Sequence, residues 1–221
     1  MNYQSIQFIL EVIGTVSFAI SGALLGIRRS MDIFGIIVLG VVTAVGGGMI
    51  RDVALGLIPP SAFLDSTFPV LAALVSVFVF LIFYRRGNHL NSRFVLTFEE
   101  YLVFFDALGL GAFTIVGMNT AAGVGYLDNG FLVLFCGMIT GIGGGIVRDL
   151  LAGIVPFVFI RQVYGAASFI GGVFYLLLYK SLGPSLAMIV GFLLVVVVRM
   201  VAHIKKWNLP RVRVEDMEEG K

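Results

Sequence analysis

The chain has 221 residues, of which 59% are hydrophobic and only 13% are charged, and its formal net charge is +2. A soluble domain is usually about half apolar and about a quarter charged, so a mean hydropathy of +1.03 excludes a single water-soluble core. The small net charge gives no reason to expect nucleic acid as a partner. We therefore expect membrane lipids to surround most of the chain.

Seven apolar stretches are long enough to cross a bilayer as helices, which takes about 20 residues each. In chain order they are expected near residues 5–26, 34–57, 67–84, 100–118, 130–154, 163–180 and 184–202. Runs such as LAALVSVFVFLIF are apolar on every face, whereas the strands of a β-barrel alternate apolar and polar residues. The first stretch follows MNYQSIQF, which has no positive residue, so we expect an uncleaved span. The predicted fold class is an all-α integral membrane protein with seven transmembrane helices.

The connections between the spans predict the orientation of the chain in the membrane. One side carries nearly all of the basic residues, namely Arg28, Arg29, Arg85, Arg86, Arg93, Arg161 and, in the tail, Lys205, Lys206, Arg211, Arg213 and Lys221. The opposite side has Lys180 alone. Since Lys and Arg accumulate in cytoplasmic loops, we expect the N-terminus outside and the C-terminal tail in the cytoplasm.

A glycine motif occurs twice, as GGGMIRD at 46–52 and as GGGIVRD at 143–149. At this offset of 97 residues Thr43 also matches Thr140, and upstream an offset of 95 matches Glu11 with Asp106. The sequence therefore predicts a repeat of three spans plus a seventh helix. Because three is an odd number, the second unit enters the membrane inverted, an architecture common among transport proteins.

This repeat divides the chain into four segments within one structural domain. They are a first three-helix repeat with its cytoplasmic connection (1–98), a second, inverted repeat (99–181), the seventh helix (182–202) and a cytoplasmic tail (203–221).

The glycine triplets predict kinked second and fifth helices, because three glycines in a row favour a bend or a short unwound segment. Unwound backbone at membrane depth must face protein or a water-filled cavity. The alternative is close packing, since glycine lets two helices touch. On the first interpretation the residues at the helix breaks line an ion pathway: Thr43, Gly46, Gly47, Gly48, Arg51, Asp52, Thr140, Gly143, Gly144, Gly145, Arg148 and Asp149.

The charges inside the spans suggest two pairs. Glu11 and Arg51 both lie roughly 9 Å deep from the outer side, and Asp106 and Arg148 lie equally deep from the inner side. We expect an acid–arginine pair at each mouth of a central path, whether it lines the path or braces the helices. Arg51 and its neighbour Asp52 point in different directions on a helix, so we do not expect them to pair with each other.

Other chemistry is not indicated. Neither glycine motif has the Gly-Lys-Ser/Thr ending of a phosphate-binding loop, no cluster has metal-ligand spacing, and no Ser or Cys has a His base nearby. The single Cys136 excludes a disulfide framework within the chain. We therefore expect no catalytic residues, metal site or cofactor.

With its paired GGG-x-x-RD motifs and its layout of three, three and one spans, the chain resembles the prokaryotic branch of the trimeric intracellular cation (TRIC) channel family, a domain also labelled a putative glycine transporter. The resemblance covers roughly residues 5 to 202. It implies a homotrimer in the plasma (inner) membrane, with a pore in each subunit lined by the kinked second and fifth spans. It also implies conduction of monovalent cations such as potassium. Eukaryotic relatives bind inositol lipid at a Lys-containing motif where this chain has MIRD, which counts against that role here.

Three classes of function remain open at this point: a cation channel, a small-solute carrier such as a glycine transporter, and a non-transporting membrane scaffold. Inverted repeats serve channels and carriers alike.

Overall fold

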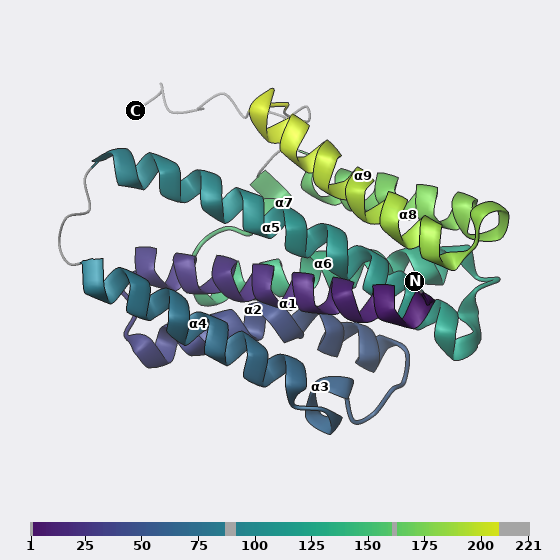
Figure 1. The fold of residues 1–221 in the computed structure, drawn as a ribbon, viewed down its shortest axis with the longest axis horizontal. Coiled ribbons are helices and arrows are strands. Elements are labelled where there is room, and N and C mark those ends of the chain that lie inside the picture. Colours follow the sequence, from purple (N-terminus) through teal and green to yellow (C-terminus); the bar gives the residue numbers. More distant parts are fainter. Residues whose placement is uncertain (1, 87–91, 161–162, 208–221) are drawn as a thin grey trace, which may run out of the picture.

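In the computed structural model, residues 2–86, 92–160 and 163–207 are described, and they form a bundle of long helices (Figure 1). Seven of these helices are long and apolar enough to cross a membrane. They are α1 (Tyr3–Arg28), α2 (Ile33–Ala54), α4 (Thr67–Arg86), α5 (Ser92–Ala121), α6 (Gly130–Leu151), α8 (Tyr164–Leu182) and α9 (Pro184–Ile204). The predicted fold class is thereby confirmed. The side chains of Arg86 and Arg93, as well as Arg161 and residues 208–221, lie outside the described part.

Three short elements were not expected from the sequence. They are α3 (Ser61–Leu64), α7 (Phe157–Ile160) and a π-helical turn, η1 (Ala122–Tyr126). The helix α5 also begins eight residues before the expected span, because it includes the segment SRFVLTFE, in which four apolar residues lie between polar ones.

The helices α2 and α6 begin and end in the same way. The side chains of Asp32 and Asn129 cap their N-termini by accepting hydrogen bonds from the backbone three residues on. Two residues after each helix comes a glycine with positive φ, Gly56 (73°) and Gly153 (67°), where a side chain would be strained. The last residue of each helix therefore lies three residues before the end of the span that hydropathy predicts.

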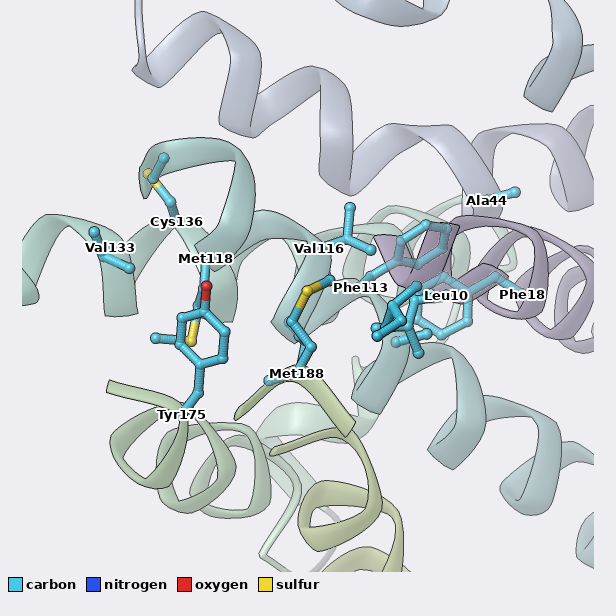
Figure 2. Packing of buried hydrophobic residues seen from close by; sticks show 14 of the residues in the cluster. Leu10, Phe18, Ala44, Phe113, Val116, Met118, Val133, Cys136, Tyr175 and Met188 are labelled. Atoms are coloured by element: carbon cyan, nitrogen blue, oxygen red, sulfur yellow. The ribbon is translucent and has the colours of Figure 1, made fainter. Parts of the chain in front are cut away.

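The two repeats pack against each other through antiparallel pairs of equivalent helices. Between α1 and α5, the ring of Phe18 fills the space beside Gly109, and the ring of Phe113 fills the space beside Gly14. The two rings lie side by side, 5.2 Å apart between centroids (Figure 2). Residue 14 thus faces residue 113 and residue 18 faces residue 109. Such an exchange of equivalent contacts is the mark of a two-fold relation, and the antiparallel course shows that the second unit is inverted.

Both glycine triplets lie inside uninterrupted α-helix. Of the two forms expected at Gly46–Gly48 and Gly143–Gly145, a bend or a short unwound segment, the unwound segment is therefore wrong, and the bend stays a prediction. The physical reason is packing, because α2 and α6 cross at these residues so closely that a side chain at Gly47 or Gly144 would overlap with the facing backbone. Glycine lowers the stability of a helix, and the close packing of α2 against α6 offsets this loss.

Candidate functional site

The candidate site is built around the crossing of α2 and α6. A Cβ atom on Gly47 would overlap with the carbonyl oxygen of Thr140, and a Cβ atom on Gly144 would overlap with that of Thr43. Gly46 and Gly143 also face the opposite helix, but they leave more room. The hydroxyls of Thr43 and Thr140 donate to carbonyl oxygens one turn earlier in their own helices. The two glycine triplets thus bring the two backbones into contact without side chains between them.

On the side of this crossing that the sequence analysis assigns to the outside, called the outer side below, Arg51 pairs with the residue next to it. Its Nε and Nη2 atoms lie 2.9 and 2.6 Å from Oδ1 of Asp52. The other oxygen of Asp52 accepts hydrogen bonds from the backbone nitrogen and the hydroxyl of Ser61, at 2.8 and 2.6 Å. Our expectation that Arg51 and Asp52 do not pair is wrong, because the long arginine side chain curls back at the end of the helix.

The expected contact between Glu11 and Arg51 is replaced by others. Glu11 accepts a hydrogen bond of 3.0 Å from Gln7, one turn earlier in α1, and Gln7 in turn accepts one from Asn119 of α5. Among the described residues, the ion pair of Arg51 is formed with Asp52. Glu11 and Arg51 still face the same cavity and interact over a longer distance.

This outer cavity has a volume of about 280 Å³ and runs from Asp65, just before α4, to Thr140 at the crossing. Its lining includes Glu11, Gly48 and Arg51. Since the formal charge of Arg51 is offset by Asp52, Glu11 and Asp65 leave the cavity with a negative formal charge. Hydrogen bonds from the side chain and the backbone of Thr67 hold the pKa of the exposed Asp65 below its usual value. The cavity is thus suited to attract cations.

On the inner side of the crossing, Arg148 is completely buried between two carboxylates. Its Nη1 atom lies 2.6 Å from Asp106, as the sequence led us to expect, and its Nη2 atom lies 2.8 Å from Asp149. Nη1 also donates to the hydroxyl of Ser21 in α1. As in the outer cluster, the second oxygen of the neighbouring aspartate accepts a backbone hydrogen bond, here 2.8 Å from the nitrogen of Phe157.

Aromatic side chains close this inner cluster. The ring of Phe157 lies 5.4 Å from the guanidinium of Arg148. The buried side chain of Tyr164 also lines this cluster, and the guanidinium of Arg199 in α9 lies 4.8 Å from the Tyr164 ring. The space among these side chains has no measurable volume for water. The two symmetric clusters therefore differ, because the outer one opens to a cavity and the inner one is sealed.

Comparison with known proteins agrees with this arrangement. A family model described as Glycine transporter matches residues 8–85 and 103–180, once over α1–α4 and once over α5–α8. A solved structure described as the structural basis for conductance through TRIC cation channels is 37% identical with a TM-score of 0.79, and the match covers 94% of this chain and 98% of the other. The chain belongs to the TRIC family.

Two further relatives extend the comparison. The UPF0126 inner membrane protein YadS of Escherichia coli is 37% identical over 203 residues, which are 90% of this chain and 92% of the relative. The structure of the TRIC trimeric intracellular cation channel orthologue from Rhodobacter sphaeroides is 30% identical with a TM-score of 0.81, covering 91% of this chain and 99% of the other. The similarity thus spans nearly the whole length of each protein.

Several residues of the two clusters were missed in the sequence. No pattern in the sequence marks Ser21, Ser61 or Phe157 as part of a cluster. Their roles depend on tertiary contacts with Arg148, Asp52 and Asp149. Arg199 had a signal that was overlooked, since an arginine inside an apolar span is costly and usually has a partner in the bundle.

Proposed function

We propose that this TRIC protein is a cation channel that conducts monovalent cations, chiefly potassium, through a pore in each subunit of a homotrimer. The observation that carries the proposal is the outer cavity, which has a negative formal charge and ends at the crossing of α2 and α6. The solved structures similar to this chain are described as cation channels, which supports the same function.

The proposed path runs from the cavity, past Gly48, to the crossing of α2 and α6, which is closely packed in this structure. Beyond the crossing it meets the inner cluster, where Arg148 is neutralised by Asp106 and Asp149. Buried charges of this kind usually face the interior of a bundle or an ion pathway. Two arginines beside the path would by themselves repel a cation, but each of them has at least one carboxylate in contact.

In this account the structure corresponds to a path that is open from outside and closed inside. The barrier is the set of contacts around Arg148, including the ring of Phe157. Conduction requires these contacts to part so that water reaches the crossing.

A carrier for a small solute such as glycine is the second candidate. The specific observation in its favour is that a cavity adjoins Arg51 whereas the space around Arg148 has no room for water, an asymmetry also expected of one state of an alternating-access transporter built from inverted repeats. The description of the family model points the same way.

For assembly and orientation, we propose a homotrimer with the N-terminus outside and the C-terminus in the cytoplasm of a prokaryotic plasma (inner) membrane. The relative from Rhodobacter sphaeroides is described as trimeric and that from Escherichia coli as an inner membrane protein. Arg28, Arg29 and Arg85 lie at the ends of α1 and α4 that we assign to the cytoplasm.

Purified protein in liposomes separates the candidates. A channel passes potassium down its gradient whether or not glycine is present. A carrier gives saturable counterflow of labelled glycine and no potassium flux beyond that of protein-free liposomes, and a scaffold does neither. Glycine counterflow without potassium flux would overturn the proposal.

A further inference from the structure

A second hollow of the molecule, separate from the outer cavity, lies between α1, α4 and α5. It has a volume of about 420 Å³ and shares no lining residue with the outer cavity. Its walls are apolar side chains such as Ile20, Leu24, Val79 and Phe105, with Tyr101 as the one polar tip. Because it lies along membrane-spanning helices, an apolar occupant must fill it.

The helix periodicity shows where this groove leads. On α1 its wall consists of Val16, Ile20 and Leu24, spaced four residues apart, and the next position in this series is Arg28. On α4 the wall includes Ile82, and Arg85 follows three residues later on the same face. Both walls therefore end at an arginine.

The charge at the arginine end of the groove distinguishes between two possible occupants, a second copy of the chain and a lipid. Both arginines are exposed, and Arg28 is 2.9 Å from Glu99 of α5, whereas Arg85 forms no ion pair with a carboxylate among the described residues. A second copy of the chain would bring a like-charged end toward the groove. A phosphate group complements it, because basic residues next to a membrane attract anionic lipid by about 1 kcal/mol each.

The length of the groove fits one leaflet. Its wall on α1 spans about 12 Å from Val16 to Leu24, and Arg28 lies about 6 Å beyond. The total is close to half of a hydrocarbon core of about 30 Å. An acyl chain lying along the wall would therefore place its headgroup level with the two arginines.

We propose that the groove between α1, α4 and α5 binds an anionic glycerophospholipid, with one acyl chain against the apolar wall and the phosphate at Arg28 and Arg85. By the proposed orientation this lipid belongs to the cytoplasmic leaflet. The site is separate from the proposed ion pathway, so it can be tested whether or not the protein conducts cations.

The test is native mass spectrometry of the protein in detergent, titrated with phosphatidylglycerol or with phosphatidylcholine. We expect wild-type protein to retain phosphatidylglycerol preferentially, one per subunit. The variant Arg85→Gln should lose about fivefold in affinity for phosphatidylglycerol, the equivalent of about 1 kcal/mol. The control Arg29→Gln removes a charge from the same end but off the groove wall, and should change the affinity less.

A second pair of variants tests the apolar wall. Ile82→Trp fills the groove at a position that is 36% exposed, and should lower binding of both lipids, whereas Leu81→Trp, at a neighbouring position that is 43% exposed and outside the groove, should not. Equal binding by these two variants overturns the proposal, as does equal retention of the two lipids by the wild type. Loss of oligomer mass in Ile82→Trp, with no change in lipid binding, would identify the groove as a contact between subunits and overturn the lipid proposal.

Discussion

Arg51 and Asp52 are neighbours in the sequence and form a buried ion pair, with Nη2 of the arginine 2.6 Å from Oδ1 of the aspartate. The equivalent pair in the second repeat, Arg148 and Asp149, has the same geometry at 2.8 Å. In both repeats the other aspartate oxygen accepts a backbone hydrogen bond from the start of the short helix that follows. The aspartate therefore fastens the arginine to the chain just beyond the helix end.

The first prediction concerns this pair. The single changes Arg51→Gln and Asp52→Asn should each destabilise the protein, and the double variant should be less destabilised than the sum of the two, since contacting residues couple by about 0.5–3 kcal/mol. Arg51→Gln combined with Glu11→Gln should come closer to additivity, because Glu11 is bonded to Gln7 instead. Thermal unfolding in detergent measures both. Stronger coupling of Arg51 to Glu11 than to Asp52 would contradict the geometry.

The second prediction uses the glycine triplet itself. Gly47→Ala should destabilise the protein by about 1–3 kcal/mol, because its Cβ atom would overlap with the carbonyl of Thr140 in a packed interface. Gly46→Ala is the matched control, since the nearest atom to its Cβ would be 3.9 Å away. In detergent, the midpoint of thermal unfolding should be lower for Gly47→Ala than for Gly46→Ala. If Gly47→Ala melts at or above the wild type, the close-packing interpretation fails.

The third prediction compares the two arginine clusters. Arg148→Gln leaves Asp106 and Asp149 buried without their cation, and breaking a buried pair costs about 3–5 kcal/mol. Arg51→Gln should cost less, because Asp52 keeps its bonds to Ser61 and the site adjoins a cavity. Unfolding of the two variants under identical conditions tests this order. Equal losses would mean that the inner cluster is not more tightly sealed.

Much of the fold could be predicted from the sequence because its causes are local. The apolar stretches set the spans, and the repeated Gly-Gly-Gly and Arg-Asp pattern sets the two-fold relation. What the glycines do could not be predicted in the same way, since a bend and a close crossing use the same residue type. The close packing is visible only in the structure, from the position of Thr140 opposite Gly47.

The partners of the charges were harder to predict than their depth. Depth along a helix correctly placed Asp106 beside Arg148. The same argument placed Glu11 beside Arg51, but Gln7 holds Glu11, and Ser61 holds Asp52 in reach of the arginine. These choices depend on side-chain rotation and on the short helix α3, which have no periodic signal.

The fourth prediction concerns orientation. In a Cys136→Ala background, cysteines at Ser30 and at Asp128 should react with an impermeant thiol reagent from opposite sides of the membrane, Asp128→Cys from outside. Both positions are exposed in connections between spans, so labelling does not require unfolding. Labelling of both from one side in intact cells would overturn the topology, and the reversed pattern would overturn the proposed orientation.

The fifth prediction links the outer cavity to transport. Gly48→Leu adds a side chain to the cavity wall, where the nearest atom to a Cβ would be 3.7 Å away, so folding should be retained and potassium flux into liposomes should fall. Val53→Leu, on an exposed face of the same helix, is the control and should leave the flux unchanged. Normal flux through Gly48→Leu would place the path elsewhere.

The most direct measurement of the central claim is single-channel recording of the wild-type protein in a planar bilayer, with a potassium chloride gradient across it. We predict discrete current steps that reverse close to the potassium equilibrium potential, because the outer cavity has a negative formal charge that admits cations and repels chloride. Reversal near the chloride potential, or the absence of steps together with saturable glycine counterflow in liposomes, would contradict the account.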